Sequence, residues 1–490
     1  MVLQLIAADL KKEKIETLII PVCEDKDIHD NQAISALIKL TRKIKEFRGR
    51  PDDELILHNL PDVGSKRVIF MGLGKLAKVD REALRVLAGR AVKKCIQKDI
   101  SEVMIAVPSS KKIKLEMLSI LEPMLEGACL GNHRFDKYKK EKKHTPLKTI
   151  RLLVKPDIME TFKKLPSRMM SICDGTILAR DWVSMPPNDK TPEQLAQSIV
   201  SLFRKRNIDV RVLEEKELKQ KKFGSILAVA AGSQSKPRMV IGVYNPDGAK
   251  QTVALVGKGV TFDSGGINLK STASLEDMKM DMSGAAAVAA TLIAVAKLKP
   301  KIKVVGIIPI VENMPSGNAA RPGDIIKSYD GKTVEIGNTD AEGRLILIDG
   351  MSYAIRKYNP QTLIDLATLT GSCVVALGEK IAGIFSFDDE LAEAIVQSGV
   401  KTHERCWRMP LPEDYKETLK SDFADIKNIS SSRWGGAITA ALFLSEFVGD
   451  TRWAHIDMAG PAYLKKENAY CGPGGTGFGV RLLCDLLEKL

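Results

Sequence analysis

Short apolar runs alternate with stretches of helical periodicity along most of the 490-residue chain. In its first third, this pattern predicts strands at residues 3–7, 15–22, 66–72, 102–107 and 149–154. Helices are predicted between them at residues 31–47, 80–98 and 114–130, and a further helix at 160–182. The alternation predicts an α/β domain.

The same alternation continues to the end of the chain. Strands are predicted at residues 208–213, 239–244, 253–257, 303–310, 362–367, 382–387 and 453–458, with helices that include 284–297, 345–358, 388–400 and 435–448. Most of these strands are apolar throughout, as in a mostly parallel sheet covered by helices on both faces. Ligand sites in such sheets lie beyond the carboxyl ends of the strands.

Charge is distributed unevenly and suggests where one domain ends. Residues 1–165 contain 34 Lys and Arg against 23 Asp and Glu, whereas residues 166–490 contain 40 against 38. Thr191-Pro192 has the pattern of a helix N-cap followed by proline at the first helical position. We therefore predict a smaller basic N-terminal α/β domain (1–158), a connecting helix (159–185) and a larger C-terminal catalytic α/β domain (186–490).

Composition narrows the compartment and the kind of metal site. The sequence is 44% hydrophobic and 28% charged, without an apolar run of the ~18 residues that a membrane helix needs. Its start reads as a strand rather than a signal peptide, and its eight cysteines form no CxxC pair. We expect a cytoplasmic protein with no membrane association. The six histidines form no HExxH motif, so any metal must be bound mainly by carboxylates.

The basic character of the first third leaves a nucleic-acid partner possible. Residues 134–148 are densely basic. A solvated loop explains such a run in most proteins, and a patch that contacts phosphates is the alternative. The run lacks the interleaved aromatic residues of a single-strand stacking platform.

Two carboxylates and a guanidinium stand close together in the octet Asn-Thr-Asp-Ala-Glu-Gly-Arg-Leu at residues 338–345. In an extended or loop backbone, Asp340, Glu342 and Arg344 would point to the same side, so we predict a loop here. Paired carboxylates repel each other unless a positive charge lies between them. The octet alone fits either a solvated acidic turn, neutralised by Arg344, or a site for a divalent cation.

A second polar group follows the predicted strand 253–257. Lys258, Asp263, Lys270 and Asp281 occur there among glycines, without the spacing of a phosphate-binding P-loop. Asp281 precedes an Ala-rich helix. One alternative is therefore that its only role is to cap the N-terminus of that helix. Together with the octet, the stretch supplies four carboxylates. That is more than one Mg²⁺ takes from protein and suits two divalent ions with shared ligands.

The two stretches together resemble the leucine aminopeptidase family of two-metal exopeptidases, the cytosol aminopeptidase type. The resemblance rests on residues 256–266 and 338–345, and continues through Ala179-Arg180-Asp181, Pro186-Pro187-Asn188, residues 365–371, 455–462 and 476–481. It extends from about residue 175 to the end. The first domain resembles the N-terminal domain of that family only in length and order of elements.

By position, the resemblance implies a role for each polar residue of the site. Five would be metal ligands: Lys258, Asp263, Asp281, Asp340 and Glu342. Asp263 and Glu342 would bridge the two ions, and Asp340 would belong to the more exchangeable site. Lys270 and Arg344 match the catalytic pair. An apolar pocket for the first side chain would be lined by Met278, Thr368, Leu369 and Ala459.

The resemblance also implies the activity. The protein would release N-terminal amino acids, preferably leucine-like, from peptides through a hydroxide activated by two divalent ions, Mn²⁺ or Zn²⁺. The substrate amine would bind one metal, Lys270 would help to polarise the scissile carbonyl, and Arg344 would hold a bicarbonate that transfers the proton. A homohexamer is implied as well.

Two other classes of function compete with this one. A DNA-binding regulator would use the basic first domain, either alone or beside peptidase activity. A Mg²⁺-dependent phosphoryl hydrolase would also suit four carboxylates, although the chain lacks a glycine loop that cradles phosphate.

Overall fold

The computed structural model describes residues 1–61, 63–142 and 145–490, which form two compact units. The first unit comprises Met1–Cys173 and Lys466–Pro473, and the second comprises Asp174–Lys465 and Gly474–Leu490. Two residues of the predicted basic run, 143 and 144, lie outside the described residues.

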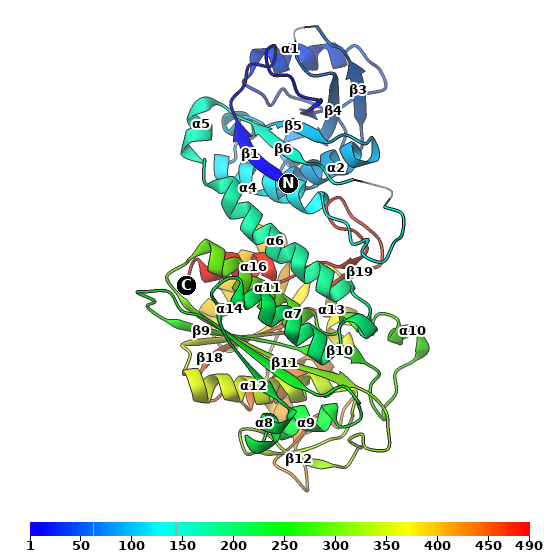
Figure 1. The fold of residues 1–490 in the computed structure, drawn as a ribbon, viewed down its shortest axis with the longest axis vertical. Coiled ribbons are helices and arrows are strands. Elements are labelled where there is room, and N and C mark those ends of the chain that lie inside the picture. Colours follow the sequence, from blue (N-terminus) through cyan, green and yellow to red (C-terminus); the bar gives the residue numbers. More distant parts are fainter. Residues whose placement is uncertain (62, 143–144) are drawn as a thin grey trace. The chain divides into compact units, whose positions relative to one another are not determined.

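The first unit contains a six-stranded sheet in the order β1-β6-β5-β2-β4-β3. Its strands are β1 (Val2–Ile6), β2 (Thr17–Cys23), β3 (Glu54–His58), β4 (Arg67–Gly74), β5 (Glu102–Ala106) and β6 (Thr149–Leu153). All neighbours are parallel except β3 and β4. Figure 1 shows α1 (Gln32–Thr41) on one side of this sheet and the helices α2 (Arg81–Gln97) and α4 (Met117–Gly131) on the other.

The second unit is built on a nine-stranded sheet with the order β16-β15-β18-β14-β9-β11-β8-β7, and β10 pairs with β11 beside this path. Its central pairs are parallel, and antiparallel pairs occur at β15–β18, β11–β8 and β7–β8. The strands are β7 (Asp209–Glu214), β8 (Arg238–Tyr244), β9 (Thr252–Gly257), β10 (Gly259–Asp263), β11 (Lys303–Asn313), β14 (Thr362–Ala367), β15 (Ala382–Phe385), β16 (Cys406–Arg408) and β18 (Arg452–Asp457).

Helices cover both faces of this sheet (Figure 1). One face carries α7 (Pro192–Arg204), α11 (Ser283–Leu298), α14 (Asp389–Thr402) and α16 (Val480–Leu487). The other carries α8 (Glu215–Gln220), α9 (Gly224–Ala230), α12 (Glu342–Tyr358) and α15 (Gly436–Ser445). A further helix, α6 (Leu165–Ser184), has 20 residues. Smaller elements are α3 (Ser110–Ile113), α5 (Pro156–Thr161), α10 (Thr272–Leu275), α13 (Gly371–Leu377), β12 (Ile325–Lys327), β13 (Thr333–Glu335), β17 (Ile426–Lys427), β19 (Tyr463–Leu464), β20 (Gly474–Gly475) and the 3₁₀ turns η1 (Leu76–Lys78), η2 (Pro187–Asp189), η3 (Met278–Met280) and η4 (Glu413–Leu419).

The predicted α/β class, with two domains and a mostly parallel, helix-covered sheet, is confirmed. Thr191 caps α7 as expected, and Gln194 completes a capping box with it. The pattern missed β3, β10, β16, the small sheet β12-β13-β17 and the pair β19–β20. Apart from β3, which has an apolar centre, these strands are short or contain polar and glycine residues, so they carry little apolar periodicity.

Glycines let α11 lie against the sheet near the end of β9. A Cβ on Gly257 would stand 2.5 Å from the carbonyl oxygen of Gly284, and a Cβ on Gly284 would stand 2.0 Å from that of Leu366. Neither distance is possible for a real side chain, so both positions require glycine. This close approach brings the N-terminus of α11 to the carboxyl ends of β9 and β14.

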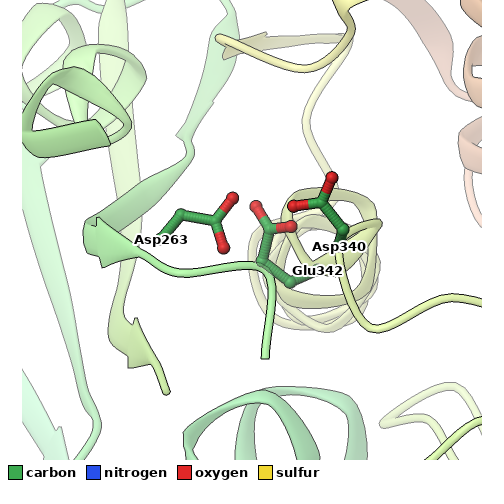
Figure 2. A group of neighbouring side chains, drawn as sticks. All are labelled: Asp263, Asp340 and Glu342. Carbon is green, nitrogen blue, oxygen red and sulfur yellow. The ribbon is translucent and has the colours of Figure 1, made fainter. Parts of the chain in front are cut away.

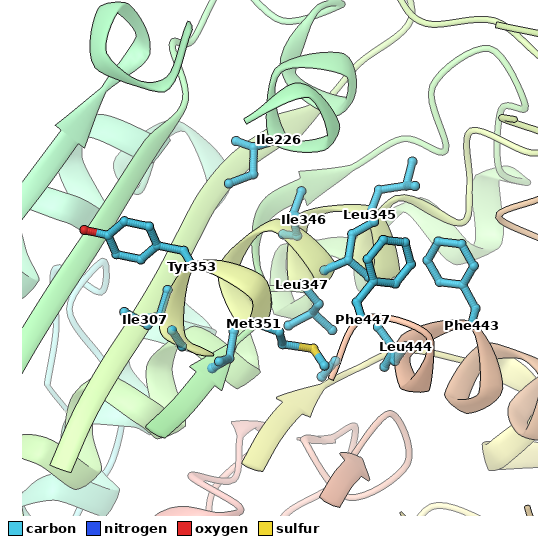
Figure 3. Packing of buried hydrophobic residues seen from close by; sticks show 14 of the residues in the cluster. Ile226, Ile307, Leu345, Ile346, Leu347, Met351, Tyr353, Phe443, Leu444 and Phe447 are labelled. Carbon is cyan, nitrogen blue, oxygen red and sulfur yellow. The ribbon is translucent and has the colours of Figure 1, made fainter. Parts of the chain in front are cut away.

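The opposite face of the sheet packs on α12. Leu345, Ile346, Leu347 and Met351 of this helix are fully or almost fully buried with Ile307 of β11, Ile226 of α9 and the aromatic residues of the α15 region (Figure 3). The helix thus begins at the polar centre described below and is held in place by apolar packing along its length.

The helical segment Met278–Leu298 is long and apolar enough to cross a membrane by length and composition. Within the protein, 83% of its most apolar 18-residue stretch is buried, as is usual for a core helix. All eight cysteines are buried free thiols.

The core next to α12 can be tested by truncating one aromatic side chain. Phe443 is fully buried, and its ring centroid lies 5.5 Å from that of Phe447. Phe443→Ala should lower the free energy of unfolding of the second unit by about 3–5 kcal/mol, because it removes apolar burial and leaves a cavity. Denaturant unfolding followed by tryptophan fluorescence measures the change.

Phe423→Ala is the matched control, since that side chain is 79% exposed. Its effect should stay within about 0.5 kcal/mol. Equal effects of the two substitutions would contradict the packing seen here.

Candidate metal centre

A polar centre lies at the carboxyl ends of the parallel strands, where ligand sites in such sheets are expected. Lys258 follows β9, Asp263 ends β10, and Thr368 follows β14. Glu342 begins α12, and Asp281 lies two residues ahead of α11. The sheet therefore brings together segments that are far apart in sequence.

Lys258 organises the more buried half of the centre. Its Nζ lies 2.8 Å from Asp281 Oδ1 and 2.8 Å from Glu342 Oε1. It also donates to the carbonyl oxygen of Thr368 at 2.9 Å. Thr368 Oγ1 donates to Asp281 Oδ1 at 2.8 Å. Lys258, Asp281 and Glu342 are each less than 5% exposed, so the ammonium and both carboxylates are held out of water.

Lys270 occupies the other half. Its Nζ lies 2.9 Å from Asp263 Oδ2 and forms a second ion pair with Asp340. Asp263 Oδ1 accepts hydrogen bonds from Asn313 Nδ2 at 2.8 Å and from the backbone N–H of Gly265 at 2.9 Å. Asp263 is therefore fixed by donors on both of its oxygens.

The two halves meet at three carboxylates. Asp263, Asp340 and Glu342 each place an oxygen within 4.8 Å of the others. Figure 2 shows the three carboxylates converging on a common space from β10 and from the start of α12. This separation suits cations that share ligands, because bridging carboxylates hold two ions about 3.5–4 Å apart.

The site raises the pKa of its three aspartates. Burial raises the pKa of Asp263, Asp281 and Asp340 above its ordinary value, and for Asp281 the rise is large. The negative charge of Glu342 adds to the rise at Asp263 and Asp281. Carboxylates gathered out of water favour protonation unless positive charge enters.

The pKa values of the two lysines are raised as well, but by the neighbouring negative charges rather than by burial. Burial alone would lower the pKa of Lys258, but the charges of Asp281, Glu342 and Asp263 outweigh it and raise the pKa. The pKa of Lys270 is raised in the same way, chiefly by Asp263 and Glu342 against the effect of burial. In this arrangement both lysines are ammonium ions that neutralise the carboxylates.

The donor set fits divalent cations. Four carboxylates face two ammonium groups, which leaves a formal charge of −2. Within the described chain, Asp281 Oδ2 is buried without a hydrogen-bond partner. A buried carboxylate oxygen left unpaired is costly, and a hard cation with oxygen ligands would satisfy it.

The predicted loop over the octet is wrong in its second half. Helix α12 begins at Glu342, three residues before the predicted start, so only Asn338–Ala341 is irregular. Asp340, Glu342 and Arg344 therefore do not alternate along an extended chain. Asp340 and Glu342 still converge, because the turn ahead of the helix redirects the backbone.

Because α12 begins at Glu342, Arg344 does not lie beside Asp340 and Glu342 as it would in an extended chain. Its Nη1 donates to the carbonyl oxygen of Asn428 at 2.7 Å, and its Nε is a buried donor without a partner in the described chain. Burial lowers the pKa of its guanidinium to about 10, against the opposing charges of Glu342 and Asp457. The acidic-turn alternative, with Arg344 as the counter-ion, is not what the structure forms.

The structure also decides the alternative for Asp281. Met282 occupies the N-cap position of α11, and no side chain caps the helix. Asp281 is directed instead to Lys258 and Thr368.

The predicted substrate-binding residues border the centre. Thr368 is bound to Asp281, and the backbone N–H groups of Leu369 and Ala459 both donate to Asp457 Oδ1 at 3.1 Å. Met278 is half-buried in η3, and its carbonyl oxygen accepts from the N–H of Asp281 at 3.3 Å.

Sequence reasoning missed the residues that hold the centre in place. Asn313 binds both Asp263 and the carbonyl oxygen of Thr339, and Asn428 binds the octet. Asp457 joins the loops after β14 and β18. Its place at the end of β18 was a usable signal, whereas neither asparagine belongs to a pattern with a recognisable spacing.

His455 lies in a neighbouring buried network. Its Nδ1 is 2.6 Å from Asp365 Oδ1, and Trp453 Nε1 donates to the second oxygen of Asp365 at 2.8 Å. Burial alone would lower the pKa of His455, but Asp365 outweighs it and raises the pKa. The ring is fully buried.

Comparison with known proteins finds one family that matches both parts of the chain. Residues 177–484 match the catalytic domain of the cytosol aminopeptidase family, and residues 19–142 match its N-terminal domain. A probable cytosol aminopeptidase of Geobacter sp. (strain M21) is 41% identical over 460 residues, covering 93% of this chain and 92% of the relative. One from Clostridium perfringens (strain 13 / Type A) is 38% identical over 488 residues, covering 98% of each.

Solved structures share the fold over almost the whole chain. The bottromycin maturation enzyme BotP in complex with Mn superposes with a TM-score of 0.87 at 32% sequence identity, covering 97% of this chain and 99% of BotP. A second structure of BotP gives a TM-score of 0.86 at the same identity and coverage.

The sheet, the carboxylate centre and these matches define a metallopeptidase, and the chain belongs to the cytosol aminopeptidase family. It is a metal-dependent aminopeptidase, a hydrolase that acts on peptides.

The position of the Lys258 ammonium group can be tested by a substitution at Gly343. A Cβ on Gly343 would stand 2.5 Å from Lys258 Cε and 2.7 Å from its Nζ. Gly343→Ala should displace the ammonium and lower kcat/KM on the order of 10²-fold, since misplacement by about 1 Å has that effect. Because only the end of a flexible side chain must move, the thermal unfolding midpoint should hardly change.

Gly317→Ala is the matched control, because nothing lies within 4 Å of the added Cβ. It should leave both activity and unfolding unchanged. Wild-type activity of Gly343→Ala would show that the position of Lys258 does not matter.

Proposed function

We propose that the protein releases N-terminal amino acids, preferably leucine-like ones, from peptides, with two divalent cations bound at the carboxylate centre. The observation that carries this proposal is the convergence of four buried or half-buried carboxylates on two lysines. Mn²⁺ and Zn²⁺ are the cations we propose, and the neighbouring fold of BotP in complex with Mn supports the first.

Five residues form the proposed ligand set: Lys258, Asp263, Asp281, Asp340 and Glu342. Asp263 and Glu342 would serve both cation sites, because each belongs to the group whose oxygens lie within 4.8 Å of one another and each side chain is only 2% exposed. Lys258 and Asp281 serve the more buried site. Asp340, whose side chain is 34% exposed, serves the more exchangeable one.

The cations, when bound, supply Lewis acidity that anchors the substrate amine, polarises the scissile carbonyl and makes a water more acidic. They also compete with the lysines for the same carboxylate oxygens. Cations would reverse the field that now favours the ammonium form of Lys258, so that a neutral amine becomes the favoured form. Lys270, relieved of Asp263 and Asp340, can then donate a hydrogen bond to the developing oxyanion.

Arg344 is proposed to hold a small anion, bicarbonate, beside the reacting carbon. The guanidinium is anchored by one nitrogen to the carbonyl oxygen of Asn428 and keeps a buried Nε without a partner in the described chain. A fixed guanidinium with an unused donor suits a planar oxyanion. Such an anion supplies a proton acceptor that the buried, Asp365-bound His455 does not.

The proposed pocket for the first side chain is lined by Met278, Thr368, Leu369 and Ala459. The shared anchor of Leu369 and Ala459 on Asp457 supports this proposal, because it holds the two backbone segments together. A mostly apolar lining would favour leucine-like side chains. We further propose a cytoplasmic location, in line with the name of the family. We also propose that the protein forms a homohexamer and that its domain limits lie at residues 158 and 186.

Hydrolysis of a leucyl chromogenic amide tests the proposal. Metal-stripped protein should be inactive and should recover activity with Mn²⁺ or Zn²⁺. Lys270→Ala should lower kcat on the order of 10²–10³-fold with a smaller change in KM, because the lost hydrogen bond matters most in the transition state. Initial rates against metal and substrate concentration provide both readouts.

Lys236→Ala is the control for removal of a lysine, since Lys236 is an exposed residue on another surface. Activity that survives full chelation, or Lys270→Ala behaving like the control, would refute the two-cation mechanism. Faster hydrolysis of arginyl or glutamyl amides than of leucyl amides would refute the proposed preference alone.

A second candidate function is binding of DNA by the basic first domain, alone or beside peptidase activity. Its support is the net charge of +11 over residues 1–165, obtained from 34 Lys and Arg minus 23 Asp and Glu. Three arginines, Arg42, Arg48 and Arg50, also border one cavity of about 300 Å³ in this unit. Arginine side chains gathered in this way can contact phosphates.

A mobility-shift titration of duplex DNA at several salt concentrations tests this candidate. Binding through several phosphates should weaken log-linearly with salt, and an Arg48→Ala/Arg50→Ala variant should show a shallower slope. Absence of a complex at low salt would rule the candidate out.

A further inference from the structure

We propose that Asn428 is a positioning residue of the metal centre. Its side chain holds the turn that carries Asp340, so that one of the two cation sites depends on it. The inference rests on the proposed role of Asp340 as a ligand, and it adds a residue on a distant segment to the centre.

The whole side chain of Asn428 is used on this turn. Its Oδ1 accepts from the backbone N–H groups of Gly337 at 2.7 Å and Asn338 at 3.3 Å. Its Nδ2 donates to the carbonyl oxygens of Asn338 at 2.8 Å and Ala341 at 3.5 Å. Asn428 is 0% exposed, so its amide depends on these contacts rather than on bulk water for its hydrogen bonds.

The backbone of Asn428 is fixed independently. Its N–H donates to the carbonyl oxygen of Glu335 at 3.0 Å, directly after the parallel pair of β17 with β13. Its carbonyl oxygen accepts from Arg344 Nη1 at 2.7 Å. One residue thus bridges the entry to the turn, the turn itself and the first helical turn of α12.

Asp340 needs such support more than the other acids do. The side chains of Asp263, Asp281 and Glu342 are 2%, 6% and 2% exposed, whereas that of Asp340 is 34% exposed. Less packing surrounds it, so its place depends on the backbone of its turn. Only one residue connects Asn428 to Asp340. Asn338 accepts a hydrogen bond from Asn428 through its carbonyl oxygen, and the Oδ1 of Asn338 accepts from the N–H of Asp340 at 2.7 Å.

Only an asparagine meets these requirements at this point. Aspartate would keep the acceptor for two N–H groups but would direct a second oxygen at the carbonyl oxygens of Asn338 and Ala341. Alanine would leave four buried or partly buried backbone groups without this partner. Both substitutions keep the backbone carbonyl oxygen that accepts from Arg344. They therefore remove the support of the turn without removing the hydrogen bond to Arg344.

Removal of the side chain should therefore weaken one cation site and spare the other. Loss of a residue that supports a ligand typically lowers metal affinity about 10–100-fold. The more buried site, with Lys258, Asp281 and Glu342, has no contact with Asn428 among those of the described residues.

The experiment titrates Mn²⁺ into metal-stripped full-length protein and measures free Mn²⁺ by electron paramagnetic resonance. Wild type should bind two ions. Asn428→Ala and Asn428→Asp should keep one tight site and show the other weakened about 10–100-fold. At saturating Mn²⁺, kcat should largely recover, which a misfolded protein would not show. Asn318→Ala, which changes an exposed asparagine, is the control.

Each outcome has one meaning. Two tight sites in Asn428→Asp would overturn the proposal, as would equal weakening of both sites in a variant whose thermal unfolding midpoint is unchanged. If Asn428→Ala fails to fold, Asn428→Asp decides. If wild type itself binds no Mn²⁺, the proposed metal function fails, which is distinct from unchanged binding by the variants.

Discussion

The requirement to neutralise four carboxylates held together away from bulk water governs the catalytic unit. Two like charges 4 Å apart repel by about 4 kcal/mol at an effective dielectric constant near 20, so the arrangement cannot stand without positive charge. Lys258 and Lys270 supply that charge in the protein alone. The same electrostatic demand makes the site a binding place for divalent cations, which carry more charge in less volume.

The fold meets this demand by bringing together ends of elements rather than one continuous motif. Strand ends give Lys258 and Asp263, the segment before α11 gives Asp281, and the start of α12 gives Glu342. Gly257 and Gly284 are needed because the first turn of α11 lies directly against the end of β9. Apolar packing along α12 then holds the acidic end of that helix at the sheet.

Hydrogen bonds between the loops give the centre its precision. Asn313 joins β11 to Asp263 and to the octet, Asn428 joins β17 to the octet, and Asp457 joins the loops beyond β14 and β18. The two bonds of Asn313 are buried and the others are partly buried, so water competes little with them. The loops around the centre are thus bound to one another as well as to the sheet.

The sequence alone predicted most of the periodic elements and the polar residues that the structure brings together at the centre. Apolar runs located β9, β14 and β18, and two motifs drew attention to Lys258, Asp263, Lys270, Asp281, Asp340 and Glu342. The start of α12 at Glu342, the separation of Arg344 from its neighbouring acids and the roles of Asn428 and Asp457 were decided only by tertiary structure. The physical reason is range: periodicity reports burial within one element, whereas these features depend on contacts between residues some 84 to 90 positions apart.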